Sequence, residues 1–307
     1  VFHDFTYSDG NYKNQVAIGF CFYIDPKDET RRLMVSTQDL STGIHWGIYP
    51  GSADLEGFSE IELADTPGYE VFNTPVSDLS GVTHFVTDAS YRDENTDDGF
   101  KEFTEAQCEG DIGFFRLPVD FTFHGVTYPR LSYIPRGFYK TLQIIKHRDT
   151  ILQDSDVALD LPQASADETE LQCLNRLMSE IVLINDNDIK WRQLYYPAAS
   201  LCHHFQPSVR NGLVLNDRFK AGMWFLPAIG DLIRCYWHDK ERNAEGSQDA
   251  IFQKWAESGL FNAWRSSWYW SAAEGSSHYA WYIDFSNGYL HNYSKFNARS
   301  VRAMAAF

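Results

Sequence analysis

A single hairpin signal near the end of the chain constrains the fold more than any other feature. The stretch YAWYIDFSNGYL, residues 279–290, alternates on both sides of Asn287-Gly288. Asn-Gly readily adopts the positive φ angles of a tight turn, so the flanking runs are predicted to pair as antiparallel strands. Alternation sends successive side chains to opposite faces of a sheet. The residues predicted to face the core are Trp268, Trp270, Trp281, Ile283, Phe285 and Leu290.

Other elements follow from hydrophobic periodicity and turn residues. An N-terminal hairpin is predicted from two strand-like runs, 15–25 and 31–40, which the turn-forming PKDET separates. Apolar residues at three- and four-residue spacing predict helices. The predicted helices cover 165–186, capped by Ser165 and Glu168, 197 to about 205, the later part of 224–240, and 248–259, ended by Gly259. Further strands are predicted at 139–147, 267–272 and 300–307.

Composition excludes several kinds of partner. Hydrophobic residues make up 44% of the 307 residues, enough for a sizeable core, and the formal net charge is −16. An acidic chain is repelled by nucleic-acid phosphates and by anionic lipid surfaces, so neither is expected as a partner. No apolar stretch approaches the roughly 20 residues of a membrane span. The five widely spaced cysteines indicate buried thiols, with at most two disulfides as the alternative.

Several ordered fragments resemble C-type-lectin-fold surface proteins of gut Bacteroidetes. They are similar in particular to the branch that includes formylglycine-generating-enzyme-like domains and the variable proteins of diversity-generating retroelements. The fragments that carry the resemblance are WYWSAAE at 268–274, AWYIDFSNG at 280–288 and VRAM at 301–304. The same ordered string includes AIGFCFYID, LMVSTQDLS, WGIYP, YPAAS and WFLPAIGDL, so the resemblance covers about residues 15–307, and the stretch at about 50–160 matches less well. Similar fragments also occur at the ends of fimbrillin-type surface proteins.

The resemblance implies an α+β, C-type-lectin-like fold. It would contain small twisted antiparallel sheets, two main helices and a long, irregular, strand-poor insertion at about 50–160. The N-terminal and C-terminal strands would pair. We expect residues 1–14 to form a polar entry arm and residues 15–307 to form a single domain. The binding or variable region would span 268–307.

The resemblance also implies ligand recognition without catalysis. The enzymes of the branch use late active-site cysteines, and no cysteine follows Cys235 in this chain. In the retroelement-linked members, diversification acts between fixed framework positions. The corresponding ligand-binding candidates are Gly275, His278, Tyr279, Tyr282, Asp284, Ser286, Tyr289, His291, Asn292, Tyr293, Ser294, Phe296, Asn297, Arg299 and Ser300.

The residue types support this hypothesis independently. Tyr, Ser, Asn and Gly dominate antibody paratopes, because Tyr offers a large amphipathic surface at low entropic cost and the small polar residues adapt their hydrogen bonds. Aromatic side chains near Arg299 and His291 have the composition of a binding hot spot. The side chains expected to be exposed there are Tyr282, Tyr289, Tyr293 and Phe296.

Two other classes of function remain open from the sequence. The first is an enzyme that acts on glycans or peptides through Glu274, Asp284 and His278, although Glu274 fits a framework hydrogen-bonding role better. The second is a structural pilus subunit. The preferred hypothesis is an adhesin at the cell surface, in a pilus-tip or lipoprotein context, whose export signal lies outside this sequence. Its ligand would be a protein or a surface glycan, with no cofactor and no metal.

Overall fold

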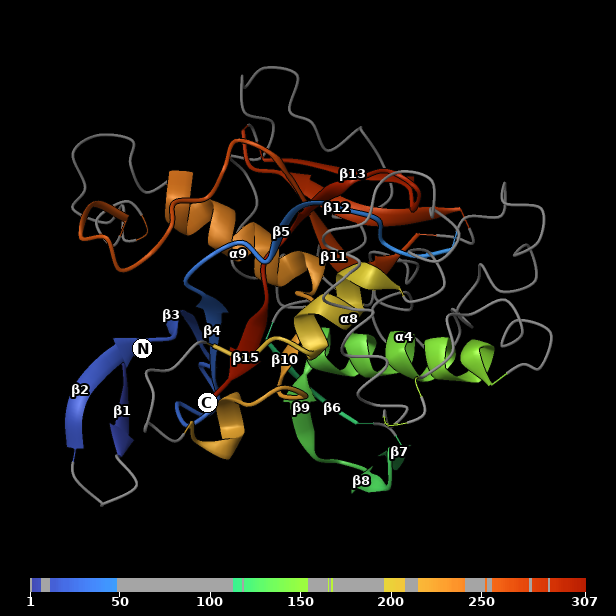
Figure 1. Cartoon of the computed structure of the whole chain (residues 1–307), viewed down its shortest axis with the longest axis horizontal. Coiled ribbons are helices and arrows are strands. Elements are labelled where there is room, and N and C mark those ends of the chain that lie inside the picture. The colour runs from blue at the N-terminus through green and yellow to red at the C-terminus, as the bar shows by residue number, and fades with distance from the viewer. Residues whose placement is uncertain are drawn as a thin grey trace.

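A four-stranded sheet joins the two ends of the chain. Its order is β10-β15-β4-β3, and all of its neighbours pair antiparallel. Figure 1 shows β15, next to the C-terminus, lying beside β4. The predicted N-terminal hairpin and the predicted pairing of the terminal strands are therefore confirmed. The strands are β3 Gly19–Ile24, β4 Arg32–Ser36, β10 Trp224–Phe225 and β15 Met304–Ala306.

The structure is a computed structural model, and it describes most of the N-terminal and C-terminal parts of the chain. The residues described are 2–6, 12–48, 113–117, 119–153, 165, 167, 196–207, 215–240, 252, 256–275, 278–286 and 288–307. The helix predicted at 165–186 lies outside them except for Ser165 and Asp167. Cys108 and Cys173 also lie outside them.

A five-stranded sheet carries the C-terminal hairpin. Its order is β13-β12-β11-β14-β5, and β14 runs parallel to β11 while the other pairs are antiparallel. The hairpin predicted at Asn287-Gly288 is confirmed, because Asp284 pairs with Tyr289 and Gly288 has a φ of +75°. The strands are β5 Ser41–Ile44, β11 Trp268–Glu274, β12 Tyr279–Asp284, β13 Tyr289–Ser294 and β14 Arg299–Val301.

Three two-stranded pairs complete the β-structure of the described residues. The expected polar arm at 1–14 contains β1 and the first residues of β2, which pair with each other. The pairs are β1 Phe2–Thr6 with β2 Tyr12–Ala17, β6 Phe114–Arg116 with β9 Tyr133–Pro135, and β7 Phe121–Phe123 with β8 Val126–Tyr128.

The strand predicted at 139–147 is wrong, because this stretch lies within a helix of 17 residues. Tyr139, Ile144 and Ile145 have high β-propensity, but Leu142 and Ile145 also fall on one helical face, and both are buried. The insertion expected to be strand-poor contains four strands and this helix in its described part. The helices are α4 Arg136–Leu152, α8 Pro197–His203, α9 Ile229–Lys240 and the 3-10 turn η5 Asp217–Phe219.

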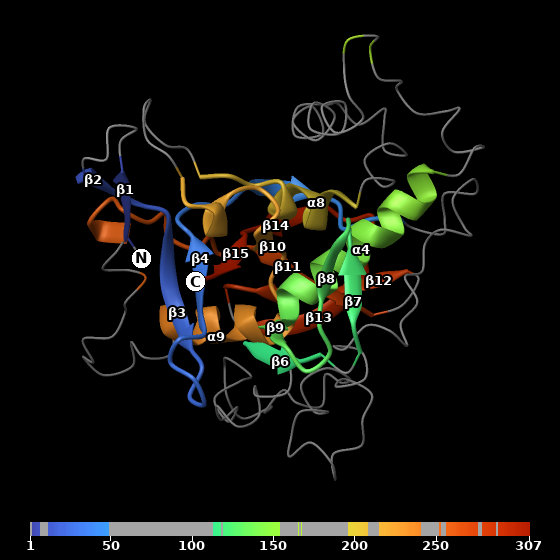
Figure 2. The same ribbon diagram turned by 90° about the horizontal axis from the view of Figure 1, so that it is seen from below.

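Two of the helices pack against the five-stranded sheet. Helix α4 contacts β11, and α9 contacts β11 and β12. Figure 2 shows α4 passing close to β7 and β8 on the same side of the molecule. The helices predicted at 197–205 and within 224–240 are confirmed as α8 and α9. For 248–259, Phe252 and residues 256–257 are helical, and Gly259 follows with a φ of +72°.

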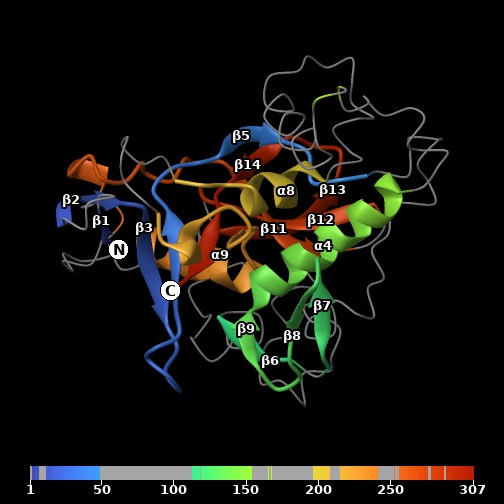
Figure 3. The ribbon, with the colours of Figure 1, turned by 60° about the horizontal axis from the view of Figure 1, so that its bottom comes forward.

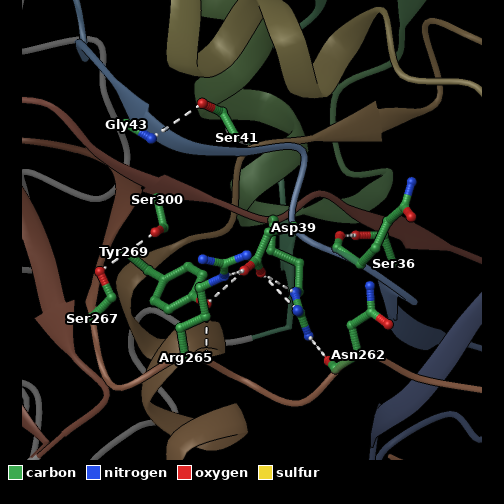
Figure 4. Close-up of polar contacts among 11 residues, drawn as sticks. Ser36, Asp39, Ser41, Gly43, Asn262, Arg265, Ser267, Tyr269 and Ser300 are labelled. Atoms are coloured by element: carbon green, nitrogen blue, oxygen red, sulfur yellow. Dashed lines mark hydrogen bonds and ion pairs between the residues drawn. The ribbon is translucent and has the colours of Figure 1, made fainter. Parts of the chain in front are cut away.

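The largely buried carboxylate of Asp39 connects segments distant in sequence (Figure 4). Asp39 follows β4, and its Oδ1 accepts a hydrogen bond of 2.6 Å from Nε of Arg302. Its Oδ2 accepts one of 3.0 Å from the Tyr269 hydroxyl and lies 3.3 Å from Nε of Arg265. Nη1 of Arg302 in turn donates to the backbone oxygen of Asn262 at 3.0 Å. Asp39 therefore ties the N-terminal hairpin to three residues of the C-terminal part of the chain.

The core is one cluster of apolar side chains shared by both sheets and the helices. Cys202 and Cys235 lie within it as free thiols, and Cys21 is a half-buried free thiol, as expected for thiols that pack as small apolar groups. Across the described residues, no helix combines the length and the apolarity that crossing a bilayer requires. The described architecture is α+β, with three α-helices and several small, mainly antiparallel sheets.

Candidate functional site: an arginine within an aromatic cage

Four aromatic side chains surround the guanidinium group of Arg299. Its Cζ lies 4.0 Å from the ring centroid of Tyr282, 4.3 Å from that of Trp268, 5.1 Å from that of Trp270 and 5.4 Å from that of Tyr293. All four distances are within the roughly 6 Å over which a cation is attracted to an aromatic face. We call these five side chains the aromatic cage.

Strand register brings the cage together. Trp270 pairs with Tyr282, and Tyr282 pairs with His291, so these three side chains project from the same face of the sheet. The rings confirm this, because Trp270 meets Tyr282 edge-on at 5.9 Å and His291 stacks on Tyr282 at 5.9 Å. Arg299 reaches the same face from β14, which runs beside β11.

The cage combines a buried floor with an exposed rim. Trp270, Tyr282 and Arg299 are 0%, 5% and 4% exposed, whereas Trp268 and Tyr293 are 46% and 47% exposed. Nε1 of Trp268 donates a hydrogen bond of 2.7 Å to Oδ2 of Asp284, which fixes the plane of the indole ring. The rim therefore presents two large aromatic surfaces to solvent in a defined orientation.

The guanidinium of Arg299 faces aromatic rings, and the nearby carboxylate of Asp284 does not form an ion pair with it. Within the described part of the chain it forms no ion pair, and its Nε has no hydrogen-bond partner. Burial lowers the pKa of Arg299, and the nearby Tyr282, Tyr293 and Asp284 oppose that effect. Guanidinium stays protonated at neutral pH even so. A cation beneath exposed aromatic rings favours ligands that bring an aromatic surface or a hydrogen-bond acceptor.

Two predictions about these side chains are wrong. Tyr282 was expected to be exposed, but Arg299 and the flanking rings cover it. Trp268 was expected in the core, but its pairing with Asp284 places it on the face opposite Ile283 and leaves it exposed. Trp270 is buried as expected, although on the cage side of the sheet, so the sequence analysis missed both tryptophans as site residues. Their alternation with Tyr269 is the signal that could have revealed the shared face.

The remaining candidates lie outside the cage. Phe296, 39% exposed, stacks on His45 at 5.2 Å, and Tyr279, 44% exposed, projects from the opposite face of β12 to Tyr282. His278 and Ser286 are also exposed. The half-buried candidates are Gly275, Asp284, His291, Ser294 and Asn297. Ser300 is buried, and the side chains of Tyr289 and Asn292 lie outside the description.

The structure does not bring Glu274 and Asp284 together as a catalytic pair. Asp284 pairs with Trp268 at one end of β11, and Glu274 lies at the other end of that strand. Six residues of strand span about 20 Å, whereas the two carboxyl groups of a glycosidase lie roughly 5–9.5 Å apart. Glu274 is instead buried in an ion pair with Lys295, which supports the framework role expected for it.

The described residues contain no group of three or more His, Cys, Asp or Glu side chains that would hold a metal ion.

Comparison with known proteins found no matching family model, no similar curated protein and no similar solved structure.

Proposed function

We propose that this chain is a surface-displayed recognition protein that binds its ligand without catalysis, through the face of the five-stranded sheet that carries the aromatic cage. The observation that carries the proposal is the exposed rim of Trp268 and Tyr293 over the buried Arg299. Tyr, Trp and Arg are the residues most enriched at binding hot spots. Buried partners hold the rim in place, so little conformational entropy is lost on binding.

We further propose a C-type-lectin-like fold with a variable region at 268–307. Support comes from β15, which pairs with the N-terminal strand β4, and from the cage strands, which lie in the neighbouring sheet. Ser, Asn, His and Tyr flank the cage on β13 and in the turn after it, a composition that suits adaptable recognition. A near-identical template repeat and a reverse-transcriptase gene beside the coding sequence would be expected if the region is diversified.

A protein ligand fits this surface better than a glycan. The rim is open, and Phe296 offers a further exposed ring in the turn after β13, whereas small-ligand sites are generally concave pockets with a few precisely placed polar groups. The strands and turns that carry these residues all lie at the C-terminal end of the chain. The ligand would occupy this face at the cell surface.

The proposal is tested by a binding screen of the purified chain against protein and glycan arrays. A triple variant, Trp268→Ala with Tyr293→Ala and Phe296→Ala, is compared with the wild type. We expect the affinity to fall by at least about 30-fold, because loss of a hot-spot side chain costs about 2 kcal/mol or more. We expect the bound ligand, and the loss of affinity in the variant, on the protein array. Binding confined to the glycan array would show that the ligand is a glycan and not a protein.

A second triple variant serves as the matched control. Ile24→Ala, Val126→Ala and Tyr133→Ala remove side chains that are 49%, 55% and 49% exposed and lie outside the cage. It should bind like the wild type. Circular dichroism and urea midpoints verify that both variants remain folded, and Tyr293→Ala alone replaces the triple variant if that one unfolds. Binding that survives loss of the rim but not loss of the control residues would contradict the proposal.

A further inference from the structure

A cavity of about 740 Å³ lies apart from the aromatic cage. The C-terminal half of α4, the end of α8, the β7–β8 turn and residues 221–222 form its walls. Figure 3 shows β7 and β8 alongside α4. Its volume is within the range of small-molecule sites. None of its lining residues belongs to the cage, so it is a separate candidate site.

Two neutral histidines with unpartnered nitrogens line this cavity. His203 is 7% exposed, and its Nδ1 has no hydrogen-bond partner; Nε2 of its neighbour His204 likewise has none. Burial lowers the pKa of His203 to about 3 and that of His204 to about 4. A buried polar atom without a partner costs free energy, so both imidazoles would gain from a ligand that bonds to them.

The one carboxylate in the lining is already engaged. Oδ1 of Asp149 accepts hydrogen bonds from Nε and Nη2 of Arg148 at 2.9 Å and 2.7 Å, and its Oδ2 lies 2.7 Å from Nε2 of His124. Nη1 of Arg148 donates to Oγ of Ser200 at 2.9 Å. These contacts hold the cavity wall in place. Because both carboxylate oxygens of Asp149 already have partners, the repulsion between Asp149 and an anionic ligand is reduced.

A lysine supplies positive charge that this wall does not neutralise. Lys146 lines the cavity, is exposed, and forms no ion pair with any residue that the structure describes. Lys146 and Arg148 against Asp149 leave the lining with a net positive charge, although the whole chain has a formal net charge of −16. Phe123 and Leu152 add apolar surface beside these groups.

We propose that this cavity binds a small organic anion, which carries a carboxylate or phosphate group beside an aromatic or apolar ring. Lys146 pairs with the anionic oxygens, His203 and His204 hydrogen-bond to the ligand's polar atoms, and the ring packs on Phe123 and Leu152. The inference is independent of the proposed function of the aromatic cage.

The test is a titration of the full chain with benzoate, phenyl phosphate and uncharged benzyl alcohol, followed by NMR of the histidine imidazoles. We expect the signals of His203 and His204 to shift with benzoate or phenyl phosphate. Benzyl alcohol should bind at least about tenfold more weakly, because a charged hydrogen bond contributes roughly 1.5–3 kcal/mol. The tighter of the two anions identifies the natural class as carboxylate or phosphate.

Two exposed-lysine variants separate the cavity from general charge effects. Lys146→Met should weaken binding of the anion by about tenfold. Lys27→Met changes the net charge equally, at an exposed turn between β3 and β4, and should leave the affinity unchanged. The triple variant Trp268→Ala/Tyr293→Ala/Phe296→Ala should also bind the anion like the wild type. Three results would overturn the proposal. Benzyl alcohol could bind as tightly as the anions, the two lysine variants could weaken binding equally, or the anions could leave the NMR signals of both His203 and His204 unchanged.

Discussion

Replacement of Asp39 by Ala is expected to lower the free energy of unfolding by about 3–5 kcal/mol. The change leaves the guanidinium of Arg302, which is 1% exposed, without its carboxylate, and it removes the acceptor of the Tyr269 hydroxyl. Burial and the neighbouring Asp39 charge raise the pKa of Tyr269, so its hydroxyl stays protonated and needs an acceptor. Urea unfolding, followed by tryptophan fluorescence, measures the loss.

A surface ion pair provides the comparison. Asp217 pairs with Lys220 at 2.7 Å, but the side chains are 91% and 49% exposed. Asp217→Ala should therefore change the free energy of unfolding by less than about 1 kcal/mol. If Asp39→Ala shifts the urea midpoint no further than Asp217→Ala does, Asp39 does not join the N-terminal hairpin to the C-terminal segments in the way described.

Acidification from pH 6.5 to about 4.5 is expected to destabilise the fold by roughly 3–5 kcal/mol through His203 and His204. Their folded-state pKa values of about 3 and about 4 lie below the unfolded value of 6.5. Between pH 6.5 and 4.5 the two imidazoles become protonated in the unfolded chain but stay largely neutral in the folded chain. The stabilisation is therefore full above pH 6.5 and is lost as pH falls toward 4. Arg148 and His124 reinforce the depression of both pKa values, and Asp149 opposes it at His204.

Urea midpoints at pH 7.0, 5.5 and 4.5 measure this dependence. The double variant His203→Gln/His204→Gln should lose much of the slope between pH 6.5 and 4.5. The control variant, His278→Gln, changes an exposed histidine and should keep the wild-type slope. Parallel pH profiles for the wild type and the double variant would show that the two buried imidazoles do not govern acid stability.

The sequence predicted those helices and strands that are determined by residues close together in the chain. The C-terminal hairpin follows from alternation around Asn287-Gly288, and α8 begins at Pro197 because Pro suits the first turn of a helix. Helix α4 was predicted as a strand because β-branched and aromatic residues cluster at 139–145. The helical spacing of Phe138, Leu142 and Ile145 just after Pro135 was the better signal, and packing against the sheet decides in its favour.

The cage could not be predicted, because it depends on pairing between distant strands. Arg299 reaches Tyr282 only because β14 runs parallel to β11, and no periodicity in the sequence indicates which strand a three-residue segment will join. The same contact explains why Tyr282 is buried. The exposure of Tyr293 and Phe296, by contrast, followed from their positions on the hairpin edge and in the turn after it.

Hydroxyl-radical footprinting of the complex with a ligand from the array screen tests the central claim most directly. Oxidation of exposed aromatic side chains reports their access to solvent one residue at a time. We predict that the ligand protects Trp268, Tyr293 and Phe296, while Tyr133, 49% exposed and distant in sequence, is oxidised as in the free chain. Protection of Tyr133 with an unchanged cage rim would contradict the account and place the binding surface elsewhere.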